Sequence, residues 1–181
     1  YEASVFIDVL GWNLVDGDGS TELVTCALRR EIRSTFGLSV TVDKTVDQVD
    51  IDEYDALAIP GGFEEYGFYE HAYSEAVSDL IRQFRKQEKQ IASICVGALP
   101  VAKSGILQGR CATTYALGGG KRRDQLGGFG AEVLDQEIVE DGRVITSTGP
   151  ATAVEVAFRL LELMTSINNA DHVRSLMGFE R

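Results

Sequence analysis

The chain has 181 residues, of which 44% are apolar, and this combination suits one compact domain with a full-sized core. It contains no run of about 18 or more apolar residues and no signal-peptide pattern, so we expect no membrane-spanning helix. With 17 basic against 28 acidic residues, the net charge is −11, which argues against nucleic acid as a partner.

Apolar spacing and the positions of Gly and Pro predict helices that alternate with strands. In chain order, the sequence predicts a helix over 2–10, strands over 23–28 and 38–42, a buried strand over 56–59, a helix around 77–84, a strand over 91–94, a helix over 98–103, strands over 112–114, 137–140 and 143–147, and a final helix around 156–164.

This alternation predicts the fold class. Strands that alternate with helices pair in parallel through right-handed crossovers, so the sheet is covered on both faces. No repeat or linker divides the chain, and we expect one domain over residues 1–181. In such sheets the working residues lie just beyond the carboxyl ends of strands. Two segments have that position, the loop at 60–62 and the turn at Cys95.

The three cysteines are Cys26, Cys95 and Cys111, and they form no CxxC pair. With only two histidines, His71 and His172, the sequence has no Cys/His zinc motif, and we expect neither a metal nor another cofactor. A low, odd count of cysteines is typical of a reducing cytosol, so we expect a cytoplasmic protein. Because Cys26 and Cys111 lie inside predicted apolar strands, we expect them to pack as small hydrophobes.

Two loops resemble ligand-binding motifs without their spacing. The turn at 16–20 is similar to the start of a calcium loop, but Ala27 stands where such a loop needs a Glu, so we exclude calcium. The stretch 118–123, Gly-Gly-Gly-Lys-Arg-Arg, lacks the P-loop spacing. We interpret it as a solvated basic loop rather than an anion site.

The segment 93–97, Ser-Ile-Cys-Val-Gly, follows a predicted strand and precedes a predicted helix, which is the context of a nucleophile elbow. A helix that begins after Cys95 favours the thiolate and lowers the thiol pKa below the value of about 8.5 of a free cysteine. The N–H groups of Val96 and Gly62 are then placed to stabilise an oxyanion. The alternative interpretation is that Cys95 is a buried residue at the end of a strand and has a structural role in packing but no chemical role.

Four segments together resemble the ThiJ/PfpI superfamily, which is related to class I glutamine amidotransferases. These segments are 54–62 (YDALAIPGG), 91–97 (IASICVG), 112–115 (ATTY) and 145–150 (ITSTGP). The resemblance implies a flavodoxin-like three-layer sandwich with a mainly parallel central sheet and a nucleophile-elbow cysteine. It also implies that Cys95 is the reactive nucleophile and that the protein is a homodimer.

The resemblance assigns two further positions. In the family an acidic residue on the first helix hydrogen-bonds the cysteine sulfur, and the pattern EASVFIDV places Glu2 there. A protonated Glu2 would donate to the Cys95 thiolate. Some members carry a histidine after the Thr-Thr pair, where this chain has Tyr115, and neither His71 nor His172 is an evident substitute. Tyr115 is a poor general base near neutral pH, although it can donate a hydrogen bond or line a pocket.

The first central strand of the family is expected before Glu2 and is absent from this sequence, which begins at Tyr1. Because a sheet that lacks its central strand leaves backbone groups unpaired, we expect the record of the chain to be incomplete.

These observations lead to two main hypotheses. In the first, the protein is a cysteine-dependent hydrolase or hydratase that acts on a small electrophile, with Cys95 as nucleophile and Glu2 as proton carrier. Without a histidine base, peptidase, deglycase and glyoxalase activities are less well supported. In the second, Cys95 is reversibly oxidised by an oxidant in a redox-sensing or protective protein that turns over no substrate. A pseudoenzyme that acts as a binding module is a third alternative.

Overall fold

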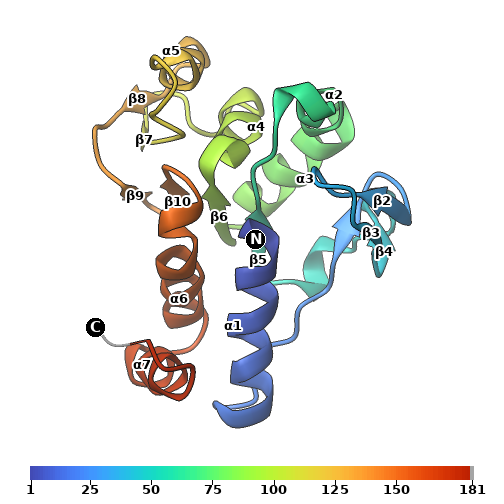
Figure 1. Cartoon of the computed structure of the whole chain (residues 1–181), viewed down its shortest axis with the longest axis vertical. Helices are drawn as coiled ribbons and strands as arrows, with labels where there is room; N and C mark the ends of the chain where they lie inside the picture. Colours follow the sequence, from blue (N-terminus) through green and yellow to red (C-terminus); the bar gives the residue numbers. More distant parts are fainter. Residues whose placement is uncertain (180–181) are drawn as a thin grey trace.

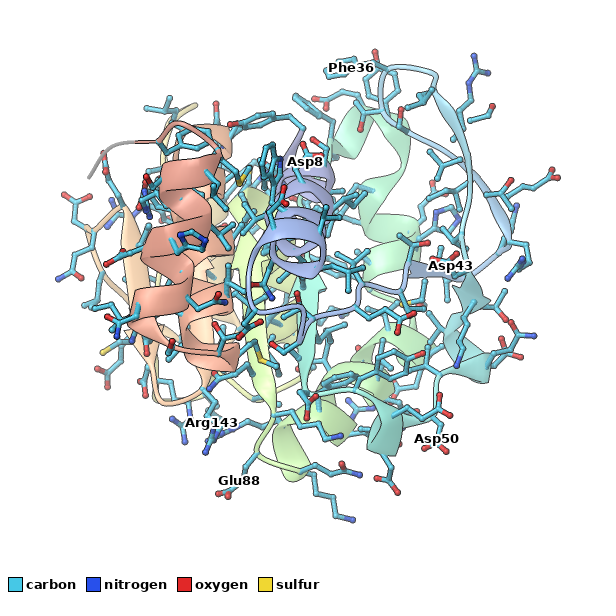
Figure 2. The ribbon with its side chains drawn as sticks, turned by 90° about the horizontal axis from the view of Figure 1, so that it is seen from below. Asp8, Phe36, Asp43, Asp50, Glu88 and Arg143 are labelled. Carbon is cyan, nitrogen blue, oxygen red and sulfur yellow. The ribbon has the colours of Figure 1, made fainter. Side chains whose placement is uncertain are left out.

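The computed structural model of the protein describes residues 1–179. Its central sheet has four strands in the order β5 (Ala56–Ile59), β6 (Gln90–Ile94), β10 (Val144–Ser147) and β9 (Ile138–Asp141). The strands β5, β6 and β10 are parallel, and β9 pairs antiparallel with β10 through the Asp141–Gly142 turn. Glu88 and Arg143, which precede β6 and β10, lie at the same edge of the molecule, as parallel strands require (Figure 2).

Helices cover both faces of this sheet, which gives the three-layer sandwich that the sequence predicts. On one face lie α1 (Glu2–Asp16), α6 (Ala153–Met164) and α7 (Ile167–Leu176), and on the other lie α3 (Glu75–Lys86), α4 (Ala98–Lys103) and α5 (Lys121–Gly128). Figure 1 shows α1 and α6 side by side in front of the sheet. The first turn of α1 lies next to β5, where the chain leaves the sheet.

The strand β6 contributes side chains to the two hydrophobic cores, one on each face of the sheet. Alternate side chains of a strand point to opposite faces of the sheet. Ala92 and Ile94 therefore pack with α1 and α6, while Ile91 packs against α3 and α4. All five residues of β6 are buried, so the turn that follows it is attached to a fully buried central strand.

The other elements are short. They are the parallel pair β1 (Cys26–Ala27) and β4 (Lys44–Thr45), the hairpin β2 (Glu31–Arg33) and β3 (Ser39–Thr41), the parallel pair β7 (Cys111–Ala112) and β8 (Glu132–Val133), the helix α2 (Phe68–Ala72), and the 3-10 turns η1 (Val46–Gln48), η2 (Ile51–Glu53), η3 (Glu64–Tyr66), η4 (Cys95–Gly97) and η5 (Pro150–Thr152). Figure 2 shows Phe36 at the tip of the hairpin, away from the sheet. Among residues 1–179, no helix is both long and apolar enough to span a membrane.

The predicted strands over 56–59, 91–94, 137–140 and 143–147 and the helix over 98–103 are confirmed to within one residue at each end. Other predictions were wrong in part, and the strand predicted over 23–28 is limited to Cys26–Ala27. The strand predicted over 112–114 is limited to Cys111–Ala112, and the basic stretch from Lys121 begins the helix α5 instead of a loop. The helices α2 and α7 were not predicted, and β5 is half-buried, because it pairs with β6 alone.

Candidate active site

Cys95 is the first residue of the turn η4 and directly follows β6, and its backbone adopts a left-handed conformation with φ of +57°. A non-glycine residue adopts this conformation rarely and at some energetic cost, and such positions cluster at functional sites. The turn is sharp because the next segment passes close to the preceding loop. A Cβ atom on Gly97 would lie 2.5 Å from the carbonyl oxygen of Ile59, so only glycine fits there.

The helix α1 brings Glu2 to the Cys95 thiol, and the two side chains form a hydrogen bond. The Gly61 N–H donates a second hydrogen bond to Glu2 Oε2 at 2.6 Å. A Cβ atom on Gly61 would lie 2.9 Å from that oxygen and 3.0 Å from Cys95 Cβ. Gly61 therefore has no room for a side chain, and its backbone holds the carboxyl group against the sulfur.

The electrostatics of this pair differ from the sequence-based prediction of a lowered thiol pKa. Burial, followed by the negative charge of Glu2, raises the pKa of Cys95 to about 12, although the Val96 N–H bond to the sulfur opposes the shift. Burial also raises the pKa of Glu2, against the Gly61 and Cys95 hydrogen bonds. The prediction was wrong because a 3-10 turn and the six-residue helix α4 do not outweigh burial beside a carboxylate.

Two groups with raised pKa values in contact titrate as a unit. Between the titration of Glu2 and that of Cys95, the pair holds a single proton, which lies either on the sulfur or on the carboxylate. A thiolate therefore forms near neutral pH only when Glu2 takes the proton.

Of the two predicted oxyanion donors, the structure brings the Val96 N–H to the sulfur. The Val96 N–H points at Cys95 Sγ. The Gly62 N–H has no hydrogen-bond acceptor among the described residues, and a Cβ atom on Gly62 would lie 2.4 Å from the Phe68 ring. Phe68 therefore packs closely over Gly62, which directly follows the Gly61 that contacts Cys95.

The segment after β7 approaches the same turn from the other side. The Thr114 hydroxyl donates to the Cys95 carbonyl oxygen at 2.8 Å, and the Thr113 N–H donates to Thr146 Oγ1 at 2.9 Å. These bonds explain why the two threonines are buried outside the strand that was predicted for them. Tyr115 follows them, is half-buried and packs near Gly149.

Arg122 is a neighbour of the site that the sequence interpretation left out. Its side chain is only 15% exposed and forms an ion pair with Glu64 at 2.7 Å. Its guanidinium lies 5.0 Å from the centre of the Tyr69 ring. Its positive charge opposes the burial that raises the pKa of Cys95. The only sequence signal for this position was its place after the Thr-Thr segment, because Glu64 and Tyr69 lie more than 50 residues away in the chain.

The other cysteines lie in different surroundings. Burial raises the pKa of Cys26, which packs against the core beside α3. Cys111 Sγ lies 3.8 Å from Glu132 Oε2, and desolvation and then the Glu132 and Asp141 charges raise its pKa. All three thiols are free, and Cys95 alone among them has a left-handed backbone and an N–H donor at its sulfur.

A surface hollow of about 660 Å³ lies between β9, α6 and α7 and includes none of the residues around Cys95. Its charged side chains are paired with each other, as Arg159 is with Glu140 and Arg174 is with Glu155. In the part of the chain that the structure describes, no group of three or more His, Cys, Asp or Glu side chains is arranged to hold a metal ion. The Cys95 turn is therefore the candidate active site.

Comparisons with known proteins show which proteins the chain resembles in sequence and in fold. The model of the DJ-1/PfpI family matches residues 1–163. A Pyrococcus horikoshii protein named as a deglycase is 38% identical over 125 residues, which cover 68% of this chain and 70% of the relative. The crystal structure of Drosophila melanogaster DJ-1beta, at 24% identity, has a TM-score of 0.85 and covers 99% of this chain and 91% of its own. A structure of oxidized Toxoplasma gondii DJ-1, at 26% identity, has a TM-score of 0.79 and covers 99% and 92%.

Proposed function

We propose, from the finding that the chain belongs to the DJ-1/PfpI family, that it is a cysteine-dependent hydrolase or hydratase of a small electrophile. The observation that supports this most is the Cys95–Glu2 pair. A nucleophilic thiol needs a neighbouring group that accepts its proton, and Glu2 is the carboxylate in hydrogen-bond contact with it. Relatives named as deglycases are consistent with a cysteine-dependent reaction of this general kind.

In the proposed reaction, Cys95 Sγ forms a bond to the electrophilic carbon while its proton moves to Glu2. The electron pair displaced at the substrate becomes an oxyanion or an equivalent anion, which the Val96 and Gly62 N–H groups stabilise. The oxygen of a water molecule then bonds to the same carbon as the bond to sulfur breaks, one proton of that water neutralises the substrate anion, and Glu2 returns its proton to Cys95. The net change is the addition of one water molecule to the substrate, and the enzyme returns to its starting state.

The raised pKa of Glu2 suits this role. A carboxylate whose pKa lies closer to neutrality is a better proton acceptor for a thiol than an ordinary exposed glutamate. Tyr115 is proposed to line the pocket or to donate a hydrogen bond, because a phenol is a weak base at neutral pH. Amide hydrolysis needs a stronger base, so a peptidase is not proposed.

A panel of small carbonyl and nitrile electrophiles tests the proposal. The parent protein should consume at least one of them catalytically, and Cys95→Ala should abolish the turnover. Cys111→Ser, which also removes a thiol beside a glutamate, should leave turnover unchanged. Turnover that survives in Cys95→Ala would show that the assignment is wrong.

The redox hypothesis is the second candidate, and one finding favours it. A structural neighbour, the Toxoplasma gondii protein, was solved in an oxidized form. In this reading Cys95 attacks hydrogen peroxide, the O–O bond breaks, one oxygen stays on the sulfur as a sulfenic acid, and the other leaves as water. Oxidation of Cys95 by peroxide without turnover of any electrophile would support this hypothesis over the first. The homodimer and the cytoplasmic location remain predictions.

A further inference from the structure

Two tyrosines on the segment that follows Phe68 have hydroxyl groups without partners among the described residues. The hydroxyls of Tyr69 and Tyr73 are buried, and neither has a hydrogen-bond acceptor among residues 1–179. Their rings pack at 4.9 Å between centres, and Phe68, which precedes them, covers Gly62. A buried hydroxyl that lacks an acceptor costs about 1–3 kcal/mol, so it calls for an explanation.

Arg122 packs against this pair of tyrosines, through the ring of Tyr69. Besides its contact with the Tyr69 ring, its guanidinium donates to Glu64 and, at 2.9 Å, to Gln125 Oε1. A guanidinium has five N–H donors, and these two bonds leave several of them available. Burial raises the pKa of Tyr73 to about 12, and the nearby Arg122 charge opposes this, as it does at Tyr69. The cluster thus combines a positive charge with several hydrogen-bond donors and has few acceptors.

We propose that Arg122 and the hydroxyls of Tyr69 and Tyr73 form an anion subsite beside Cys95, which selects small electrophiles that carry a carboxylate. This inference rests on the proposed function and names its substrate class. A carboxylate has two oxygens that accept bonds from a guanidinium and from hydroxyls together, and charge-assisted bonds of this kind are the strong ones. A carboxylate ligand supplies the acceptors that both tyrosine hydroxyls lack among residues 1–179.

Glu64 is the internal carboxylate that such a ligand displaces. It lies on η3, its side chain is 47% exposed, and it binds Lys121 at 2.9 Å as well as Arg122. When a substrate carboxylate binds Arg122, Lys121 still holds Glu64 at the surface. Glu64 therefore competes with the substrate for the guanidinium and weakens binding of anions without being required for the reaction.

Two alkylating reagents that differ in charge test the subsite. Iodoacetate and iodoacetamide both react with Cys95 by forming an Sγ–C bond as the C–I bond breaks, and iodide leaves while the thiol proton goes to Glu2. The rate at Cys95 with each reagent is read by peptide mass. Arg122→Gln should lower the iodoacetate-to-iodoacetamide rate ratio at least about tenfold and leave the iodoacetamide rate within a few-fold. Glu64→Gln should raise the ratio.

Arg123→Gln is the matched control, because Arg123 is the next residue in the chain but pairs with Asp135 instead. It should change the ratio less than about twofold. Tyr69→Phe and Tyr73→Phe should each lower the ratio by a few-fold, which keeps the test decisive if Arg122→Gln does not fold. Equal ratios in the parent, Arg122→Gln and the two phenylalanine variants would overturn the subsite.

The test does not depend on turnover. If the rate ratio depends on Arg122 while no electrophile is turned over, the subsite stands and the proposed enzyme function fails. If turnover depends on Cys95 but anionic and neutral substrates are used equally in the parent and in Arg122→Gln, the function stands and the subsite fails. Cys95 that reacts with neither reagent would contradict both.

Discussion

The backbone N–H of Gly61 donates to Glu2 Oε2 at 2.6 Å, although the two residues are 59 positions apart in the chain. This bond fixes the first residue of α1 to the loop that follows β5, and it turns the Glu2 carboxyl group toward the sulfur of Cys95. The chemistry of the cysteine therefore depends on how two distant segments meet. The predictions below start from that contact.

Gly61→Ala should disturb the site most directly. The new methyl group would lie 2.9 Å from Glu2 Oε2, 3.0 Å from Cys95 Cβ and 3.2 Å from the Ile94 carbonyl oxygen, so both side chains must shift. We expect a loss of about 1–3 kcal/mol of unfolding free energy and a reduced iodoacetamide rate at Cys95. Gly128→Ala is the control, because nothing lies within 4 Å of its added methyl group. Equal behaviour of the two variants would contradict the close packing at Gly61.

Cys95 should be the fastest of the three thiols to react with iodoacetamide near neutral pH. Glu2 accepts its proton and the Val96 N–H stabilises the thiolate, whereas burial raises the pKa of Cys26 and no such N–H supports Cys111. Peptide mass against time measures the three rates. Labelling of Cys26 or Cys111 as fast as Cys95 in the folded protein would remove the basis for assigning Cys95.

Glu2→Gln should stabilise the fold at neutral pH but not at low pH. Burial raises the pKa of Glu2 in the folded protein, so the favourable contribution of its protonated form is complete below the unfolded pKa and is lost as the pH rises through the folded pKa. Gln keeps an oxygen that accepts the Gly61 bond and carries no charge. Because the carboxyl group is only partly buried, we expect a gain of no more than about 1 kcal/mol at neutral pH.

Unfolding by urea at pH 3.5 and pH 7 measures this difference. Glu132→Gln, which removes the carboxylate beside Cys111, serves as the control for an exposed glutamate. A parent protein that gains stability relative to Glu2→Gln as the pH rises would show that the Glu2 pKa is lowered instead.

Tyr115 should limit the reactions that the protein catalyses. With no histidine at this position, we expect negligible hydrolysis of casein and weak or absent turnover of methylglyoxal, since amide hydrolysis needs a group that takes and returns a proton. The comparison is the parent against Tyr115→His, with peroxide oxidation of Cys95 as a reaction that needs no base other than Glu2. Robust Cys95-dependent proteolysis or glyoxalase turnover by the parent would mean that another base acts at the site.

The turn at Cys95 was predictable because its causes are local. An apolar run ends in small residues, a helix pattern follows, and both features are visible within a dozen residues. The role of Glu2 came only from the family resemblance, since an acid in the first turn of a helix is common on surfaces. Gly61 was missed, because its requirement for glycine arises from Glu2 and Cys95 meeting it in space.

Arg122 and the thiol pKa were missed for related reasons. Glu64 and Tyr69, which surround Arg122, belong to a different part of the chain, so a run of basic residues after three glycines resembles a solvated loop. The thiol pKa depends on the balance of burial, the Glu2 charge and the Val96 N–H, and a motif does not contain that balance.

The central claim is that Glu2 accepts the Cys95 proton, and the alkylation rate of Cys95 against pH tests it most directly. If the pair shares one proton, the fraction of thiolate is constant between its two titrations, so the iodoacetamide rate should be flat from about pH 6 to pH 9. In Glu2→Gln the rate should rise about tenfold per pH unit toward an ordinary thiol pKa. A parent rate that also rises tenfold per unit, up to the pKa of about 12, would contradict the claim.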